Sequence, residues 1–109
     1  MTKTAEKRLN PKVRKETIII AAFRVARKPG GWSRMTRAAI AKEAHCAEGL
    51  ISKYLGSMDS VRRIIMKRAI KNEYMELIAQ GIASGEPAAM ALSPVLKHKA
   101  ISSFLDLGE

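Results

Sequence analysis

The first helical stretch of the sequence carries two interleaved sets of apolar residues. One set is Ile18, Ala22 and Val25, and the other is Ile19, Phe23 and Ala26. Both follow the i, i+4, i+7 spacing that places side chains on one side of an α-helix, which predicts a broad buried stripe. Asn10 can cap a helix and Pro11 suits its first turn, whereas Pro29-Gly30-Gly31 ends the pattern. We therefore predict a helix from Asn10 to about Lys28.

Two shorter helices separated by a tight break are predicted next. The first begins at Thr36, whose hydroxyl can cap the first turn. Its buried residues would be Ile40, Ala41 and Ala44. After the break at His45-Cys46, a helix over residues 48–54 places Ile51 and Leu55 four residues apart, so both can pack on Ile40. The opposite face of this second helix is expected to be exposed.

A fourth, long helix is predicted from Ser57, which can cap it, to Gln80. Its apolar residues are Val61, Ile64, Ile65, Ala69 and Ile70 toward the core, then Tyr74, Leu77 and Ile78 beyond it. Gly81 and Gly85-Glu86-Pro87 break the pattern. Ser93-Pro94 opens a last helix through Leu105, with Val95, Leu96, Ile101, Phe104 and Leu105 apolar. The pattern thus predicts an all-α fold.

The stretch from Gly31 to Val61, GWSRMTRAAIAKEAHCAEGLISKYLGSMDSV, has the layout of a helix-turn-helix followed by a capped helix. It resembles, without a gap, the DNA-binding domain of TetR-type transcriptional regulators. The likeness is carried by Thr36, Ile40-Ala41, Ala44, Gly49 within AEGLISKYL, Gly56-Ser57, Asp59 and Val61. Upstream, IIIAAFRVARKPGGW resembles that family's first helix and its glycine exit. The resemblance implies a three-helix DNA-binding domain and a dimeric repressor.

Several positions depart from the pattern of that family. The family usually has glycine at the turn where this chain has His45, an aromatic residue where it has Ser52, and commonly lysine where it has Glu48. Histidine tolerates a left-handed turn better than most residues other than glycine, so the turn is expected to survive. An acid at position 48 repels phosphate, so the contacts of the family cannot be carried over wholesale.

The charge is divided unevenly along the chain. The net charge is +10, but residues 1–71 hold 18 Lys/Arg against 5 Asp/Glu, which gives +13, and residues 72–109 hold 2 against 5, which gives −3. A basic segment is typical of a polyanion binder. We accordingly predict a flexible basic arm over residues 1–12, a helix-turn-helix DNA-binding domain over 13–71 and a C-terminal helical dimerisation segment over 72–109.

The exposed face of the second short helix predicts the residues that read bases in double-stranded DNA. These are Glu48, Gly49, Leu50, Ser52 and Lys53. Helix starts, hydroxyls and cations predict phosphate contacts at Thr36, Arg37, Lys42, Tyr54, Ser57, Lys7, Arg8 and Lys12. Three alternatives stay open. Leu50 either touches a thymine methyl or packs on a neighbouring helix, and Tyr54 either bonds phosphate or lies half-buried. The arm cations either contact phosphate or are merely solvated.

The apolar C-terminal helix predicts a homodimer, because the N-terminal core has little room to cover it and operators for such proteins are usually two-fold symmetric. The expected contact residues are Tyr74, Leu77, Ile78, Val95, Ile101, Phe104 and Leu105.

Other kinds of site are not expected. The single Cys excludes an intrachain disulfide and a cysteine zinc site, and no catalytic or cofactor-binding pattern is present. The chain is too short to add a ligand domain, so a pocket of several hundred Å³ and a small-molecule effector are not predicted. IIIAAF is far shorter than the roughly 20 apolar residues of a membrane span, which favours a cytoplasmic, nucleoid-associated protein.

Our interpretation is a homodimeric transcriptional regulator, with repression implied by the resemblance and output set by its own concentration or by a second regulatory protein. Such short autoregulated circuits are typical of plasmids and phages. One rival is a sequence-tolerant architectural, nucleoid or plasmid-partition DNA-binding protein, for which the basic charge would suffice. Another is a protein-interaction module that uses the C-terminal helix.

Overall fold

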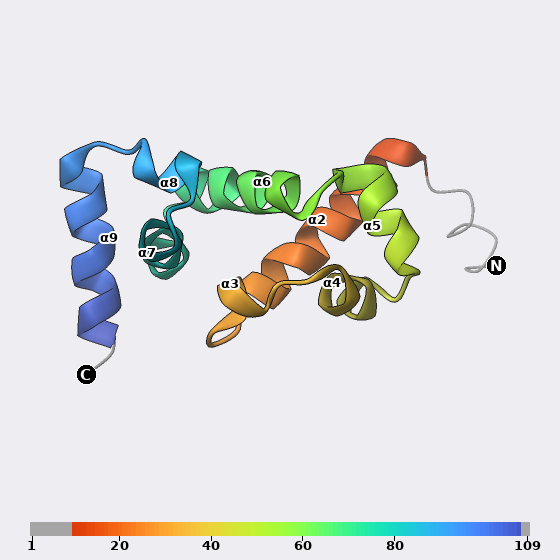
Figure 1. Ribbon diagram of the computed structural model, residues 1–109, viewed down its shortest axis with the longest axis horizontal. Coiled ribbons are helices and arrows are strands. Elements are labelled where there is room, and N and C mark those ends of the chain that lie inside the picture. Colours follow the sequence, from red (N-terminus) through yellow and green to blue (C-terminus); the bar gives the residue numbers. More distant parts are fainter. Residues whose placement is uncertain (1–9, 108–109) are drawn as a thin grey trace.

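Helices make up most of the chain in its computed structural model, which describes residues 10–107 (Figure 1). In chain order they are α2 (Pro11–Arg27), α3 (Gly31–Arg34), α4 (Arg37–Ala44), α5 (Glu48–Leu55), α6 (Met58–Lys71), α7 (Met75–Ser84), α8 (Pro87–Met90) and α9 (Pro94–Leu107). No strand occurs between residues 10 and 107. The predicted all-α fold is confirmed.

Side-chain caps start the helices where the sequence predicts them. The Asn10 side chain accepts a hydrogen bond from the Val13 amide at 2.9 Å, Thr36 Oγ1 from Ala39 at 3.1 Å, and Ser57 Oγ from Ser60 at 3.2 Å. Ser93 Oγ accepts one from Leu96 at 3.3 Å. Each bond satisfies a backbone N–H that the first helical turn leaves without a partner. The starts of α2, α4, α6 and α9 are therefore where the sequence predicts them.

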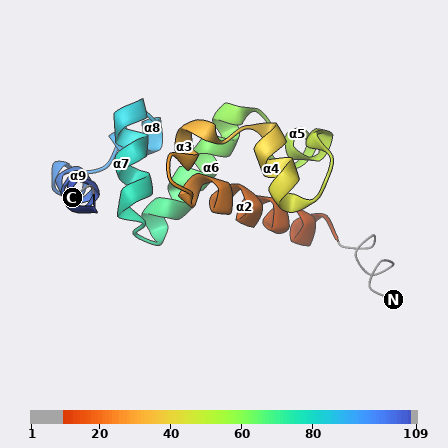
Figure 2. The ribbon, with the colours of Figure 1, turned by 90° about the horizontal axis from the view of Figure 1, so that it is seen from below.

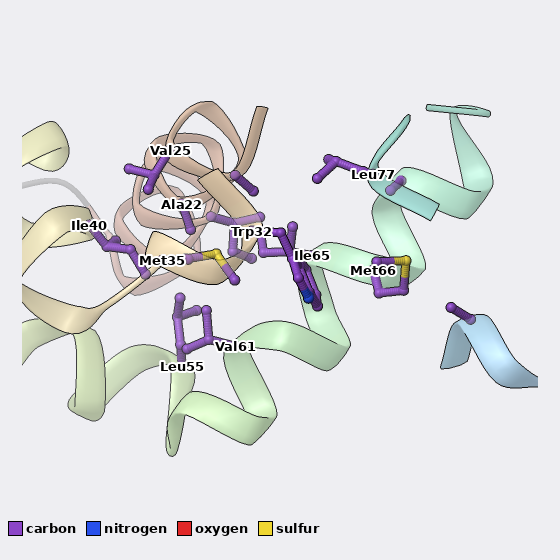
Figure 3. Packing of buried hydrophobic residues seen from close by; sticks show 14 of the residues in the cluster. Ala22, Val25, Trp32, Met35, Ile40, Leu55, Val61, Ile65, Met66 and Leu77 are labelled. Atoms are coloured by element: carbon purple, nitrogen blue, oxygen red, sulfur yellow. The ribbon is translucent and has the colours of Figure 1, made fainter. Parts of the chain in front are cut away.

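The core joins the first helices through the apolar faces that the pattern predicts. α2 packs on α4, α5 and α6, and α4 packs on α5. Ile18, Ile40, Ile51, Val61 and Ile65 are fully buried there, at 1% exposure or less. Figure 3 shows side chains from α2, α3, α4 and α6 converging on this core. The predicted packing of Ile51 and Leu55 in the Ile40 core is confirmed by their common burial.

The single turn of α3, which the pattern did not predict, anchors a tryptophan in this core. Trp32 is 4% exposed, and its Nε1 donates a hydrogen bond to Ser84 Oγ of α7 at 2.9 Å. Ser84 Oγ in turn donates to the Gly81 carbonyl at 3.1 Å. Because Trp32 belongs to one apolar cluster with Leu77, the core is continuous from α2 to the C-terminal helices (Figure 3).

Replacing Trp32 with alanine is expected to lower the free energy of unfolding by about 3–5 kcal/mol, the usual range for removing a buried aromatic ring. Trp32→Phe keeps most of the ring and loses the bond to Ser84, so a loss of only about 0.5–1.5 kcal/mol is expected. Urea unfolding of both variants measures the difference. Equal losses would contradict the packing role of the ring.

The predicted long helix from Ser57 to Gln80 is wrong, because the chain turns after Lys71. Asn72, Glu73 and Tyr74 leave the helix, and Glu73 has a φ of +56°, which few residues other than glycine adopt. The Tyr74 amide donates to the Ala69 carbonyl at 2.9 Å and closes the turn. Figure 1 shows the consequence: α6 lies along the molecule, whereas α7 is seen end-on. The turn brings the apolar face of α7 back onto the core.

Two residues predicted for the dimer contact are corrected by this turn. Leu77 and Ile78 are 2% and 3% exposed within the chain itself, so they belong to its core. Tyr74 is half-buried: its ring makes an edge contact with Phe23, 5.0 Å between centroids, and the Arg27 guanidinium lies 4.6 Å from its centroid. Tyr74, Leu77 and Ile78 therefore pack within their own chain.

Gly81 does not break a helix as predicted but lies inside α7, which runs to Ser84. A Cβ at this position would lie 2.4 Å from Met66 Cε and 3.1 Å from Ala89 Cβ. The glycine therefore allows α7 to approach α6 and α8. Gly85, with φ of +77°, ends the helix as a left-handed cap.

α9 lies at one end of an elongated molecule, 48 Å long and 26 by 20 Å across. It packs on α7, and α5 lies at the opposite end (Figures 1 and 2). Among the helices that the structure describes, none combines the length and apolar character needed to cross a membrane.

Candidate nucleic-acid interface

The exposed face of α5 is the centre of the candidate interface. Glu48, Gly49, Ser52 and Lys53 are all exposed, while Ile51 and Leu55 fasten the helix to the core. Three residues join α4 to α5, and His45 among them has φ of +56° and ψ of +48°, the left-handed turn that the sequence predicts. A short rigid link thus fixes the angle at which α5 presents its outer face.

Gly49 is the most informative residue on this face. It lies inside a helix, where glycine makes the folded state about 0.5–1 kcal/mol less stable than alanine does. A Cβ there would meet no atom within 4 Å, and the backbone φ is not positive. The fold of this chain therefore gives no reason for a glycine at position 49. Without a side chain at this position, the backbone of α5 is open to close approach by a partner surface.

Leu50 and Tyr54, two further residues predicted to touch DNA, are half-buried and pack against the core. Their burial favours the structural alternative for much of each side chain. The Lys53 ammonium lies 5.5 Å from the centroid of the Tyr54 ring, close enough for a cation–π contact. Tyr54 therefore borders the exposed face and steadies Lys53 on it.

The helix starts at Thr36 and Ser57 are capped, so both hydroxyl oxygens are already acceptors while their O–H groups can still donate. Next to Thr36, Arg37 is half-buried, and its Nε is buried with no hydrogen-bond partner in the part of the chain described. A buried unpaired donor is costly.

Ion pairs neutralise most of the acidic groups between residues 10 and 71. Glu16 pairs with Arg68, Glu43 with Lys28 at 3.2 Å, and Asp59 with Arg62 at 3.2 Å. The hydrogen bond from Arg68 lowers the pKa of the Glu16 carboxyl and raises that of the guanidinium. Glu48 is the fourth acid of this segment. It lies in the first turn of α5, where the helix dipole stabilises negative charge.

The exposed face of α5 is electrically balanced as a result, because Glu48 opposes Lys53. Positive charge lies instead on neighbouring elements. Lys12 is exposed in the first turn of α2, which begins at the same end of the molecule as α5 (Figures 1 and 2). Lys7 and Arg8 of the predicted arm lie outside the described residues.

Lys42, another predicted phosphate contact, is exposed in the last turn of α4. Together with Lys28 and Arg34 it lines a hollow of about 430 Å³ beside α4, which also reaches His45. The hollow is an open surface groove between short helices, so the expected absence of a small-molecule effector pocket stays a prediction.

The outer face of α9 keeps a second exposed surface. Val95, Leu105, Phe104 and Ile101 are 76%, 63%, 46% and 41% exposed, whereas Ala100 of the same helix is fully buried. These four are the predicted dimer residues that the folded chain leaves uncovered.

Trp32 and Glu86 are the two residues near possible sites that the sequence analysis missed. Trp32 follows a glycine loop with no apolar period around it, and Glu86 falls in a predicted break.

Comparison of the chain with protein-family models, with curated proteins and with solved structures finds no match in any of the three.

Proposed function

We propose that this protein binds specific double-stranded DNA sequences as a homodimeric transcriptional regulator, acting as a repressor of the TetR type. α4 and α5 would form a helix-turn-helix, with α5 in the major groove and the starts of α2, α4 and α6 toward the phosphates. The observation that carries the proposal is the exposed face of α5, with its glycine open to close approach. Repression would follow from occupying a promoter.

Two further features support DNA as the partner. The segment up to residue 71 carries +13, and ion pairs take up three of the acids between residues 10 and 71. Serine and lysine are side chains that bond base edges, with lysine reaching the acceptors of guanine.

Selection from random duplexes at physiological salt tests this function. A two-fold symmetric sequence recovered over several rounds would establish a dimeric, site-specific protein. Retention without an enriched sequence would instead favour the architectural rival, which the balanced charge of Glu48 and Lys53 also allows. No retention at all would contradict both and leave the protein-interaction module.

Combining Ser52→Ala with Lys53→Ala should flatten the preference for the selected sequence by about 1–3 kcal/mol, the discrimination carried by one good base contact. Affinity for unrelated duplexes should change little. Both residues are exposed, so the fold should be unaffected, which circular dichroism checks. Lys12→Ala is the matched control, because loss of a phosphate contact should weaken all duplexes alike. If the double variant keeps its preference, α5 is not the reading helix.

Combining Ile101→Glu with Leu105→Glu should weaken homodimerisation by about tenfold or more, because it places charge on the apolar outer face of α9. Light scattering over a concentration series measures the change. Thr17→Glu adds a charge at an exposed site on α2 and should leave the dimer intact. A wild-type protein that is strictly monomeric at micromolar concentration would contradict the dimer.

A further inference from the structure

The outer face of α9 carries a seam of four residues, Val95, His98, Ser102 and Leu105. Their i, i+3, i+7, i+10 spacing places them on one side of the helix, as in a coiled coil. Ala100, on the opposite side, is fully buried, and α9 packs on α7. Val95 and Leu105 are the two most exposed of the large apolar residues in the part of the chain described, so the folded chain leaves both ends of this α9 seam uncovered.

The α9 seam is symmetric about residue 100. Val95 and Leu105 each lie five positions from this centre, and His98 and Ser102 each lie two positions from it. When two copies of α9 lie antiparallel about this centre, each Val95 meets the partner subunit's Leu105, and each His98 meets the partner subunit's Ser102. A two-fold dimer contact requires a surface that is complementary to itself. The α9 seam meets this requirement, with apolar residues against apolar residues and polar residues against polar ones.

The sizes and hydrogen-bonding groups of these residues favour the antiparallel direction over the parallel one. Antiparallel pairing sets a larger side chain against a smaller one in every layer, histidine on serine and leucine on valine, which is how facing layers interdigitate. Parallel pairing would set histidine on histidine and serine on serine. Within one chain, His98 Nε2 lies 3.5 Å from Ser102 Oγ, which is long for a hydrogen bond, so both groups can still bond a partner. A polar layer between apolar layers also fixes the register of paired helices.

We propose that the α9 seam docks antiparallel on the α9 seam of a second copy of this chain. This pairing rests on the homodimer of the proposed function, and it adds to that homodimer a direction, a register and a polar contact. Each His98 imidazole would form a hydrogen bond with the partner subunit's Ser102. Ile101, which is 41% exposed, borders the seam near its centre, so it would meet the partner subunit's Ile101 beside the two-fold axis.

This pairing also sets the distance between the two α5 helices. In both views α7 lies between α9 and the rest of the chain, and α5 lies at the opposite end (Figures 1 and 2). Contact through the outer face of α9 therefore joins two molecules, each 48 Å long, end to end. The two α5 helices would lie farther apart than the roughly 34–36 Å between half-sites one helical turn apart. On a single duplex, the dimer would read half-sites two or more turns apart.

Disulfide cross-linking without DNA tests the direction of the helices. In a Cys46→Ser background, which removes the one native cysteine, Val95→Cys and Leu105→Cys are made as separate proteins. Both positions are exposed, so both variants should fold, which circular dichroism checks. After oxidation, the equimolar mixture should give several-fold more covalent dimer than either variant alone, because a disulfide needs Cα atoms about 4.4–6.8 Å apart. Thr17→Cys mixed with Leu105→Cys is the matched control and should give only background, since Thr17 is an exposed site on α2.

Cross-linking of Val95→Cys with itself would mean parallel helices, and background levels in every mixture would mean that the seams do not meet; either result overturns the proposal. Spin labels on Lys53→Cys in the same background measure the α5 spacing, again without DNA, and a main distance below about 36 Å would also overturn it. Light scattering separates the two kinds of failure. A dimer that does not cross-link keeps the proposed homodimer and loses the antiparallel seam, whereas a covalent dimer that selects no DNA sequence keeps the seam and contradicts the proposed DNA-binding function.

Discussion

Gly31→Ala is expected to destabilise the fold by about 3 kcal/mol or more, at the upper end of the cost of overpacking. A Cβ on Gly31 would lie 2.0 Å from the Val25 carbonyl oxygen and 2.8 Å from that of Ala26. Both are backbone atoms of α2, which cannot rotate away as a side chain does. The φ of Gly31 is not positive, so the penalty is steric and not conformational. Thermal unfolding should show a fall in melting temperature of about 10 °C or more.

Gly49→Ala is the matched control, since it adds the same methyl group where no atom lies within 4 Å. It should stabilise the free protein by about 0.5–1 kcal/mol, because alanine favours a helix interior over glycine. The same variant should weaken DNA binding if α5 approaches a groove closely. A Gly31→Ala protein with the same melting temperature as the wild type would contradict the close packing of α3 on α2.

The local parts of the fold could be predicted because their causes are local. Asn10, Thr36, Ser57 and Ser93 each bond an amide three residues ahead, and a single sequence contains all that such a cap needs. The turn at Glu73 could not be predicted in this way. No glycine or proline marks it, although local backbone bonds from Glu73 to Ile70 and from Tyr74 to Ala69 close it, and the turn returns Leu77 and Ile78 to the core.

The residues of the candidate site likewise differ in whether their positions follow from local sequence. Periodicity predicts which face of α5 is exposed, and Glu48, Ser52 and Lys53 lie there. Periodicity also shows that Leu77 and Ile78 are buried by something, but not whether the cover is this chain or a second copy. Glu86 stands at the other extreme, because its burial follows from the meeting of α3, α6 and α7, which are distant in sequence.

Binding of a selected duplex should weaken by roughly 10³-fold to 10⁵-fold between 50 and 200 mM salt, the range for a protein that neutralises six to ten phosphates. The cations predicted to contact phosphate are Lys7, Arg8, Lys12, Arg37 and Lys42. A dimer carries two sets of them, and each contact contributes about −0.9 to the slope of log K against log salt. Fluorescence anisotropy of a labelled duplex across a salt series measures that slope.

Lys12→Ala and Lys97→Ala separate this prediction from a general effect of charge. Each removes one positive charge, but Lys12 lies in the first turn of α2 at the α5 end of the molecule, and Lys97 lies on α9 at the other end (Figures 1 and 2). Lys12→Ala should flatten the slope by about 2 for a dimer, and Lys97→Ala should leave it unchanged. Equal slopes in both variants would mean that DNA does not lie along the α5 end, because a contact made there must release counterions when it forms.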